Sequence, residues 1–221
     1  MISNIKIYGE RCSGTNYLEV LILKNFKVNL TQEYGFKHFF GFQDLKNSDN
    51  TLFICIVRHY HSWINSFYKK QWHLSPEQRR SKKNFLYSEH WSYYDDSRNH
   101  GTNYGKEILE DRNIYNHQRY RNIIELRSMK IKWILETLPQ KVKHYMIIRY
   151  EDLIKNFDYT MYNIHLKGIP LVSPQKFPEN HTNYKNSNKK FIPKEENRIT
   201  IEEIENHPSF CPSIEKELLY L

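Results

Sequence analysis

The stretch that decides the fold is IKIYGERCSGTNYLEVLILKN, residues 5–25. It begins with a short run of β-forming residues, passes through a polar turn that starts at Gly9, and continues with apolar residues at helical spacing. We therefore expect a strand over residues 5–8 and a helix over residues 15–25. Successive backbone N–H groups in such a turn, together with the helix N-terminus, form a pocket for phosphate or sulfate.

Two further apolar runs extend this pattern along the chain. TLFICIV, residues 51–57, and HYMIIR, residues 144–149, are rich in β-formers, as buried parallel strands are. Helical patterns follow these runs over residues 60–70 and 150–166, and another precedes the second run over residues 114–137. Strands that alternate with helices indicate an α/β fold, with a parallel sheet flanked by helices on both faces.

The composition limits the class of protein. With 221 residues the chain is long enough for one α/β domain, so we expect a single domain over residues 1–221. The net charge of +8 favours anionic partners, but charge alone does not choose among nucleotides, nucleic acid, sulfated glycans and membrane surfaces. The three cysteines are widely spaced, so we expect reduced thiols, no metal site and a cytoplasmic location. Without a signal peptide or an apolar run of roughly 20 residues, no membrane contact is expected.

The turn GERCSGTN, residues 9–16, has the glycine spacing with which a nucleoside-triphosphate P-loop begins. The lysine and the magnesium-binding hydroxyl of that P-loop are missing, because Thr15 and Asn16 stand in their places. Magnesium-dependent cleavage of a triphosphate then loses its usual groups, whereas transfer from a donor that needs no metal stays possible. The alternative reading is a tight glycine turn with a Ser/Thr cap and no ligand.

The stretch KIYGERCSGTNYLEVLI, residues 6–22, resembles the 5′-phosphosulfate loop of sulfotransferases that use 3′-phosphoadenosine 5′-phosphosulfate (PAPS). The resemblance places residues 13–15 on the family's Ser-Gly-Thr and Cys12 on its usual lysine. It implies that Arg11 replaces that lysine and that Tyr17 stacks on the adenine. The residues that it assigns to the cofactor in this loop are Arg11, Cys12, Ser13, Gly14, Thr15, Asn16 and Tyr17.

Two later blocks are similar to the same family. In VRHYHSWINS, residues 57–66, Arg58 stands at a strand end and Ser66 follows eight residues later. An Arg fork and a Ser hydroxyl at this spacing can bind one anion, and the block resembles the 3′-phosphate motif of the family. RYEDL, residues 149–153, resembles a block whose tyrosine, here Tyr150, reaches the adenine.

Sulfuryl transfer requires a base for the acceptor hydroxyl and positive charge beside the sulfonate and the departing phosphate. The run GFKHFF, residues 35–40, predicts a further short strand and carries a Lys-His pair where cytosolic sulfotransferases have a lysine and a catalytic histidine. The resemblance implies His38 as the base, with Arg11 and Lys37 as catalytic cations. On a strand, adjacent side chains point to opposite faces, so Lys37 and His38 are not both expected to reach the site. Glu33 is the alternative base.

Two polar segments complete the sequence-based interpretation. Residues 71–112 are too long for an idle connection, and we expect a lid or an acceptor-binding insertion, with an insertion that does not contact substrate as the alternative. The polar loop over residues 180–190 is expected to close over the 3′-phosphate, with Lys185 as the contact.

The resulting hypothesis is a sulfotransferase that moves a sulfuryl group from PAPS to a hydroxyl or amine of a small-molecule or glycan acceptor. The product would be adenosine 3′,5′-bisphosphate (PAP), and neither a metal nor nucleic acid is expected to take part. The alternatives are a nucleotide or sugar kinase with a degenerate P-loop and a non-catalytic, basic nucleic-acid-binding domain. Neither the acceptor nor the oligomeric state follows from the sequence.

Overall fold

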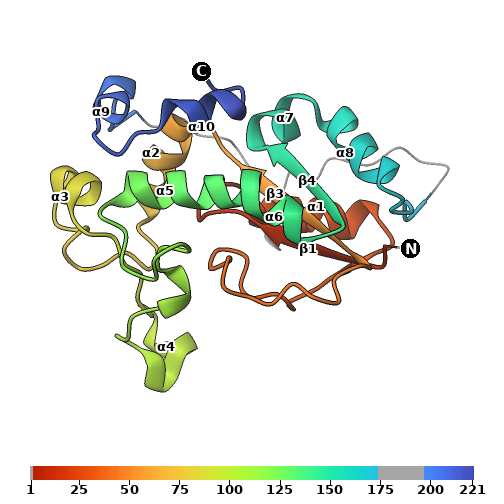
Figure 1. The fold of residues 1–221 in the computed structure, drawn as a ribbon, viewed down its shortest axis with the longest axis horizontal. Helices are drawn as coiled ribbons and strands as arrows, with labels where there is room; N and C mark the ends of the chain where they lie inside the picture. The colour runs from red at the N-terminus through yellow and green to blue at the C-terminus, as the bar shows by residue number, and fades with distance from the viewer. Residues whose placement is uncertain (1, 174–196) are drawn as a thin grey trace. The chain divides into compact units, whose positions relative to one another are not determined.

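The structure is a computed structural model that describes residues 2–173 and 197–221. The chain forms two compact units, and Figure 1 follows its course by colour. The first unit combines residues 1–38, 43–59 and 136–194, and the second combines residues 39–42, 60–135 and 195–221. The expected single domain over residues 1–221 stays a prediction.

The first unit is built on a four-stranded parallel sheet, which confirms the α/β class. The strand order is β2-β1-β3-β4, and β1, β3 and β4 are labelled in Figure 1. The strands are β1 (Asn4–Tyr8), β2 (Asn29–Leu30), β3 (Thr51–Val57) and β4 (His144–Arg149). Tyr8 is paired in register with Cys55, and Val57 with Arg149, so the carboxyl ends of three strands meet at one edge of the sheet.

One face of this sheet packs against α1 (Thr15–Asn25), α7 (Tyr150–Lys155) and α8 (Phe157–Leu166). Alternate strand residues supply this face, because successive side chains on a strand point to opposite sides. Its buried core includes Ile5, Ile7, Leu52, Ile54, Ile56 and Ile148 from the strands, with Leu18, Leu21, Ile22, Leu153, Met161 and Ile164 from the helices. This core holds α1 and α7 at the carboxyl edge of the sheet, where their N-termini begin.

The strand predicted over residues 35–40 is wrong. The segment forms bends and turns that follow β2 along the edge of β1. The N–H of Gly9 donates to the carbonyl of Lys37 at 3.1 Å, so the segment meets the sheet at the anion loop instead of extending it as a regular strand. The expectation that Lys37 and His38 point to opposite faces of a strand therefore has no basis.

Two predicted helices differ from the structure in their boundaries. The helix expected over residues 114–137 begins only with α5 (Ile123–Lys132), because the side chain of Asn122 caps it by accepting backbone N–H bonds of Ile124 and Glu125. It then passes through a π-helical turn, Trp133–Thr137, into α6 (Leu138–Lys141). The helix expected over residues 150–166 is interrupted at Asn156, which separates α7 from α8.

The second unit is mainly helical. Its further helices are α2 (Tyr60–Lys70), α3 (Lys82–Tyr87), α4 (Ser97–His100), α9 (Ile201–Glu205) and α10 (Pro212–Glu217), with 3₁₀ turns Gly101–Asn103 and Leu109–Asp111. A capping box begins α9, since the side chains of Thr200 and Glu203 each accept the backbone N–H of the other residue. The residues expected to form a lid, 71–112, thus contain α3, α4 and both 3₁₀ turns.

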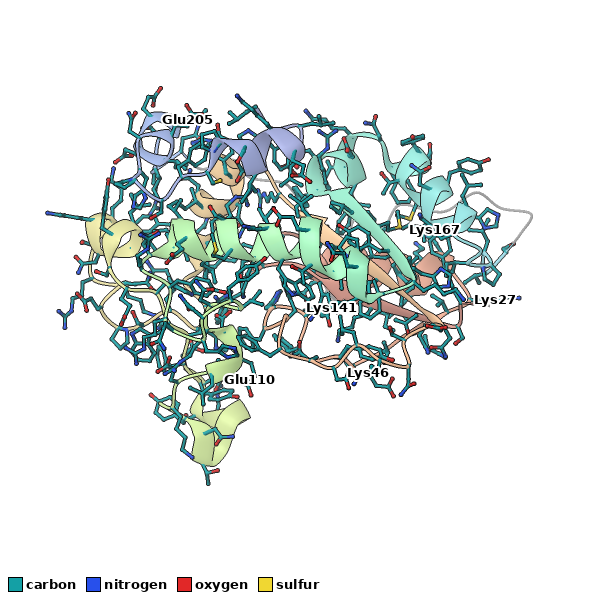
Figure 2. All side chains as sticks on the ribbon, viewed as in Figure 1. Lys27, Lys46, Glu110, Lys141, Lys167 and Glu205 are labelled. Atoms are coloured by element: carbon teal, nitrogen blue, oxygen red, sulfur yellow. The ribbon has the colours of Figure 1, made fainter. Side chains whose placement is uncertain are left out.

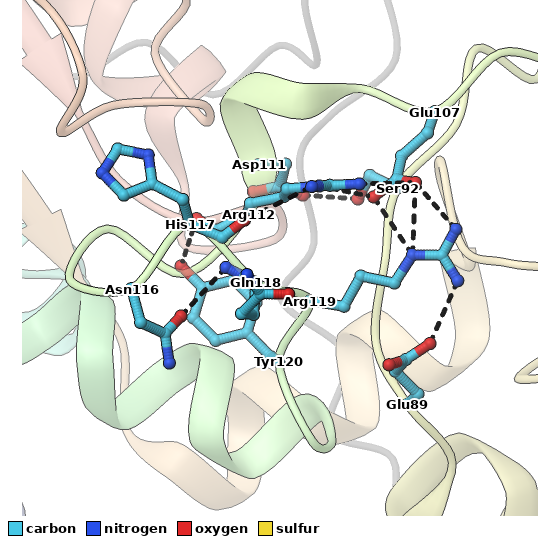
Figure 3. A network of polar contacts seen from close by, with 10 residues as sticks. All are labelled: Glu89, Ser92, Glu107, Asp111, Arg112, Asn116, His117, Gln118, Arg119 and Tyr120. Carbon is cyan, nitrogen blue, oxygen red and sulfur yellow. Dashed lines mark hydrogen bonds and ion pairs between the residues drawn. The ribbon is translucent and has the colours of Figure 1, made fainter.

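A network of ion pairs fixes part of this segment, as Figure 3 shows. Arg119 lies between two carboxylates, with its Nη2 2.7 Å from Glu107 and its Nη1 3.0 Å from Glu89. Arg112 donates to the other oxygen of Glu107 at 3.0 Å. Although burial opposes the shift, hydrogen bonds from Arg119 and Arg112 hold the pKa of Glu107 below its ordinary value. This part of the second unit therefore has a defined structure of its own, and its role as a lid stays a prediction.

A buried ion pair lies deeper in the same unit. The ammonium of Lys130 donates to Asp111, whose other oxygen accepts from the hydroxyl of Ser92. Lys130 and Asp111 are each 1% exposed, so neither charge is shielded by water. Removal of one partner from such a pair leaves the other charge buried without a charge of opposite sign beside it.

We expect Asp111→Ala to lower the free energy of unfolding by about 3–5 kcal/mol, because it leaves the Lys130 ammonium buried without its carboxylate. Urea denaturation followed by circular dichroism measures the loss. Glu89→Ala is the matched control, since it removes a carboxylate that is 58% exposed and paired with Arg119 in the same unit. That control should cost less than about 1 kcal/mol. Equal losses in both variants would contradict the argument.

Candidate anion-binding site

The turn between β1 and α1 is compact. Gly14 is the N-cap residue of α1 and has φ 98°, and Cys12 also has a positive φ of 67°. The N–H of Ser13 donates to the carbonyl of Glu10 at 3.1 Å, and the carbonyl of Gly14 accepts from the N–H of Leu18 at 3.0 Å. The backbone therefore turns directly into the N-terminus of an eleven-residue helix, an arrangement that binds anions in many proteins.

A close approach of Tyr150 requires glycine at position 14. A Cβ atom on Gly14 would lie 2.6 Å from Cδ2 of Tyr150, and the positive φ of Gly14 also disfavours any other residue. Tyr150 begins α7 directly after β4 and is buried. The turn after β1 and the start of α7 are therefore packed against one another.

Arg58 reaches the same place from the end of β3. Its Nη1 donates to the carbonyl of Cys12 at 3.2 Å, and its guanidinium carbon lies 4.7 Å from the centre of the Tyr150 ring. Burial raises the pKa of Tyr150, and the neighbouring charge of Arg58 opposes that shift. The first unit thus brings together the anion loop, Arg58 and Tyr150, three features that the sequence places after three different strands.

Arg11 is less available to an anion than the sequence suggests. Its side chain is 3% exposed, and its Nε donates to the carboxylate of Glu10 at 2.8 Å. The same carboxylate oxygen accepts the backbone N–H of Arg11 at 2.7 Å. The charge of Arg11 is therefore offset by its chain neighbour, and its role as the substitute cation stays a prediction.

Lys37 and His38 both contact the region of the anion loop. The ammonium of Lys37 lies 2.5 Å from Oδ1 of Asn16 and 2.7 Å from Oε2 of Glu19, both on α1. Nδ1 of His38 lies 2.6 Å from the carbonyl oxygen of Gly9. Because the segment is a turn and not a strand, both side chains reach the first strand–helix connection.

The protonation state of His38 follows from these contacts. Burial lowers the pKa of His38 to about 3; Glu10 and the Gly9 carbonyl oppose the shift, while Lys37 and Arg11 reinforce it. Since a carbonyl oxygen can only accept, Nδ1 of the neutral ring carries the proton and Nε2 carries the lone pair. A neutral imidazole in this tautomer has an acceptor nitrogen, and the lowered pKa makes that nitrogen a weaker base than in an ordinary histidine.

Three predicted residues are not part of this cluster. Ser66 lies half-buried on α2, which belongs to the second unit, so its convergence with Arg58 on one anion stays a prediction. Glu33 is exposed after β2, where its own N–H donates to Oγ1 of Thr31. Lys185 lies outside the described residues, as does the whole loop over residues 180–190.

Glu19 and Lys6 are site residues that the sequence analysis missed. Glu19 lies one helical turn after Asn16, a spacing that places the two side chains on one face of α1. Lys6 interrupts the apolar pattern of β1 with a charge, and it is 2% exposed in the structure. A charged residue inside a short apolar strand is the signal that points to such a buried group.

Two absences hold for residues 2–173 and 197–221. In these residues, no group of three or more His, Cys, Asp or Glu side chains is placed to hold a metal ion. Nor do these residues contain a helix long and apolar enough to cross a membrane.

Figure 2 labels four exposed lysines of the first unit. They lie on several different turns and helix ends, and they are Lys27, Lys46, Lys141 and Lys167.

Comparison with known proteins gives no relative. No family model matches the chain, and no curated protein or solved structure matches it either. The chemistry of the anion loop and its neighbours must therefore carry any functional argument.

We expect Gly14→Ala to destabilise the protein more than Gly168→Ala does. Both glycines have positive φ, 98° and 87°, so each alanine pays the left-handed backbone penalty of about 1 kcal/mol. A Cβ on Gly168 meets nothing within 4 Å, whereas one on Gly14 collides with the Tyr150 ring. Thermal denaturation of both variants measures the difference, and equal midpoints would show that Tyr150 does not press on the loop.

We expect His38 to make the protein less stable as the pH falls below 6.5. In the unfolded chain His38 binds a proton near pH 6.5, and in the folded chain only near pH 3. Proton binding to His38 therefore favours unfolding between about pH 6.5 and pH 3. His38→Asn keeps an N–H donor for Gly9 but does not titrate. Between pH 6.5 and 5 the wild type should lose on the order of 1 kcal/mol relative to His38→Asn in urea titrations. Parallel stability curves would contradict the assignment.

Proposed function

We propose that this chain is a PAPS-dependent sulfotransferase, with the P-loop-like sulfotransferase fold, that acts on a small-molecule or glycan acceptor. The observation that carries the proposal is the juxtaposition of the Gly9–Thr15 turn with Arg58 and Tyr150 in the first unit. Backbone N–H groups, a guanidinium and an aromatic ring together suit a ligand that contains phosphate groups and a purine.

The absent P-loop lysine favours a sulfuryl donor over a nucleoside triphosphate. Thr15 and Asn16 occupy the positions of the lysine and the metal-binding hydroxyl, and the side chain of Asn16 is used in a bond to Lys37. Triphosphate cleavage depends on a cation and magnesium at those positions. Transfer from a phosphosulfate requires positive charge beside the oxygen that bridges phosphorus and sulfur. Cations from outside the loop can supply this positive charge.

The proposed roles of Lys37 and His38 follow from their places beside the turn. Nε2 of His38 accepts the proton of the acceptor hydroxyl or amine while the new bond to sulfur forms. The bond between sulfur and the phosphate oxygen of the donor breaks, and that oxygen keeps the electron pair in PAP. Lys37 and the N–H groups of the turn stabilise the charge that develops there.

We expect PAP to raise the melting temperature of the wild-type protein more than ATP or AMP does. A ligand that binds only the folded state stabilises it by about 2.7 kcal/mol at a hundred times its dissociation constant. Arg58→Ala should remove most of this shift, and Arg58→Lys, which keeps the charge, should retain part of it. Arg98→Ala is the control, because it removes an arginine whose side chain is 90% exposed.

Other outcomes distinguish the alternatives. No shift with PAP would overturn the proposed function. A larger shift with ATP and magnesium would favour the kinase. Equal responses to PAP and AMP, with tight binding of DNA that weakens steeply as salt rises, would favour the nucleic-acid-binding domain.

A further inference from the structure

Glu19 forms an ion pair with the candidate catalytic lysine, Lys37. Its Oε2 lies 2.7 Å from the ammonium of Lys37, and the exposed fractions of the two side chains are only 26% and 16%. Asn16, one turn earlier on α1, contributes a second contact to the same ammonium at 2.5 Å. Two side chains of one helix therefore contact a lysine that comes from a turn outside the helix.

Lys6, on β1, contacts the backbone of the segment that carries Lys37. Its ammonium donates to the carbonyl of Gly35, lies 3.5 Å from the carbonyl oxygen of Thr31, and lies 5.6 Å from the centre of the Tyr8 ring. Burial lowers the pKa of Lys6 to about 8; the charge of Glu19 opposes this shift and that of Lys37 reinforces it. The carboxylate of Glu19 therefore forms an ion pair with Lys37 and acts on Lys6 only as a more distant charge.

This arrangement differs from an ordinary surface ion pair. Lys46 and Asp44, in the same unit, are 3.7 Å apart with side chains 85% and 70% exposed, and such pairs contribute little. A buried lysine is costly unless its hydrogen bonds are satisfied, and the bonds of Lys6 go to backbone carbonyls of the turn that carries Lys37. The ammonium of Lys6 and the carboxylate of Glu19 thus both contact the segment that carries Lys37.

We propose that Glu19 is a positioning residue for Lys37, and that Lys6 fixes, through the Gly35 carbonyl, the turn from which Lys37 and His38 extend. An ammonium has three N–H donors, and Asn16 and Glu19 accept two of them. The third is directed to a bound anion at the first turn of α1, where the helix N-terminus also attracts negative charge. The link from Lys37 to the bound anion rests on the proposed function, but the positioning of Lys37 does not.

The first test measures the position of Lys37 without any ligand. Acetic anhydride labelling followed by mass spectrometry reports how freely each lysine ammonium reacts. Loss of the charged hydrogen bond in Glu19→Gln should make Lys37 react at least about fivefold faster. Asp44→Asn, which removes an exposed carboxylate from the neighbouring loop, should leave Lys37 unchanged. Equal labelling of Lys37 in wild type and Glu19→Gln would overturn the proposal.

Lys6 is tested by the exchange of backbone amides. Lys6→Met keeps the length of the side chain and removes the donor to Gly35. Hydrogen exchange over residues 31–38 should become faster in this variant, while exchange in the helix α8 stays the same. Unchanged exchange over residues 31–38 would remove Lys6 from the proposal. Where Lys6→Met fails to fold, Lys6→Arg, which keeps the cation, should fold and retain the protection.

The third test asks whether Glu19 acts through Lys37. Calorimetric titration with PAP compares the wild type, Glu19→Gln, Lys37→Met and the double variant. Glu19→Gln should weaken PAP binding about fivefold when Lys37 is present and less than about twofold in the Lys37→Met background. The same loss in both backgrounds would assign Glu19 a merely structural role. If the wild type does not bind PAP, the proposed function fails, while the labelling result still decides whether Glu19 positions Lys37.

Discussion

The contact between Tyr150 and Gly14 is the constraint on which the candidate site depends. It packs the start of α7 against the start of α1, and both helices stand at the carboxyl edge of one parallel sheet. Ligands of open α/β sheets bind at this edge because backbone N–H groups and strand-end side chains converge there. A side chain larger than hydrogen at position 14 would separate the two turns, and Arg58 would lose the surface formed by Cys12 and Tyr150.

Charge balance imposes a second constraint. Among the described residues, three cations with defined contacts lie in or beside the loop: Arg11 with Glu10, Lys37 with Glu19, and Arg58 with the carbonyl of Cys12. Paired cations close to a helix N-terminus stay fixed in the absence of an anion, which lowers the reorganisation that binding requires. The carboxylates weaken the positive potential, but they fix the positions of the donors.

The sequence predicted the main elements because their signals are local. The apolar runs of β3 and β4 and the glycine turn after β1 depend on residues that are close in the chain. The segment over residues 35–40 could not be predicted in this way, since its backbone conformation is set by bonds from Gly9 and Lys6, which lie about 30 residues away. The start of α5 depended on a single cap, Asn122, inside a sequence whose apolar pattern began earlier.

The site was predicted in part for the same reason. The positions of Arg58 and Tyr150 follow from strand topology, because both residues come directly after a strand. The burial of Arg11 could not be inferred, since it depends on how Glu10 folds back over the turn. The contact of Lys37 with Glu19 depends on the irregular path of residues 31–38, which sequence periodicity does not reveal.

A loop without the usual lysine can still serve an anionic donor if a cation arrives from another segment. Coulomb attraction depends on the distance between charges and on their shielding from water, not on their order in the chain. Cys12 and Gly14 have positive φ, so the loop backbone is wound tightly towards α1, and Lys37 enters from the neighbouring turn to contact that helix. In the proposed function Lys37 substitutes for the loop lysine, and the ion pair with Glu19 keeps its ammonium beside α1 instead of in solvent. On this argument the missing loop lysine and the carboxylate at position 19 are two parts of one arrangement.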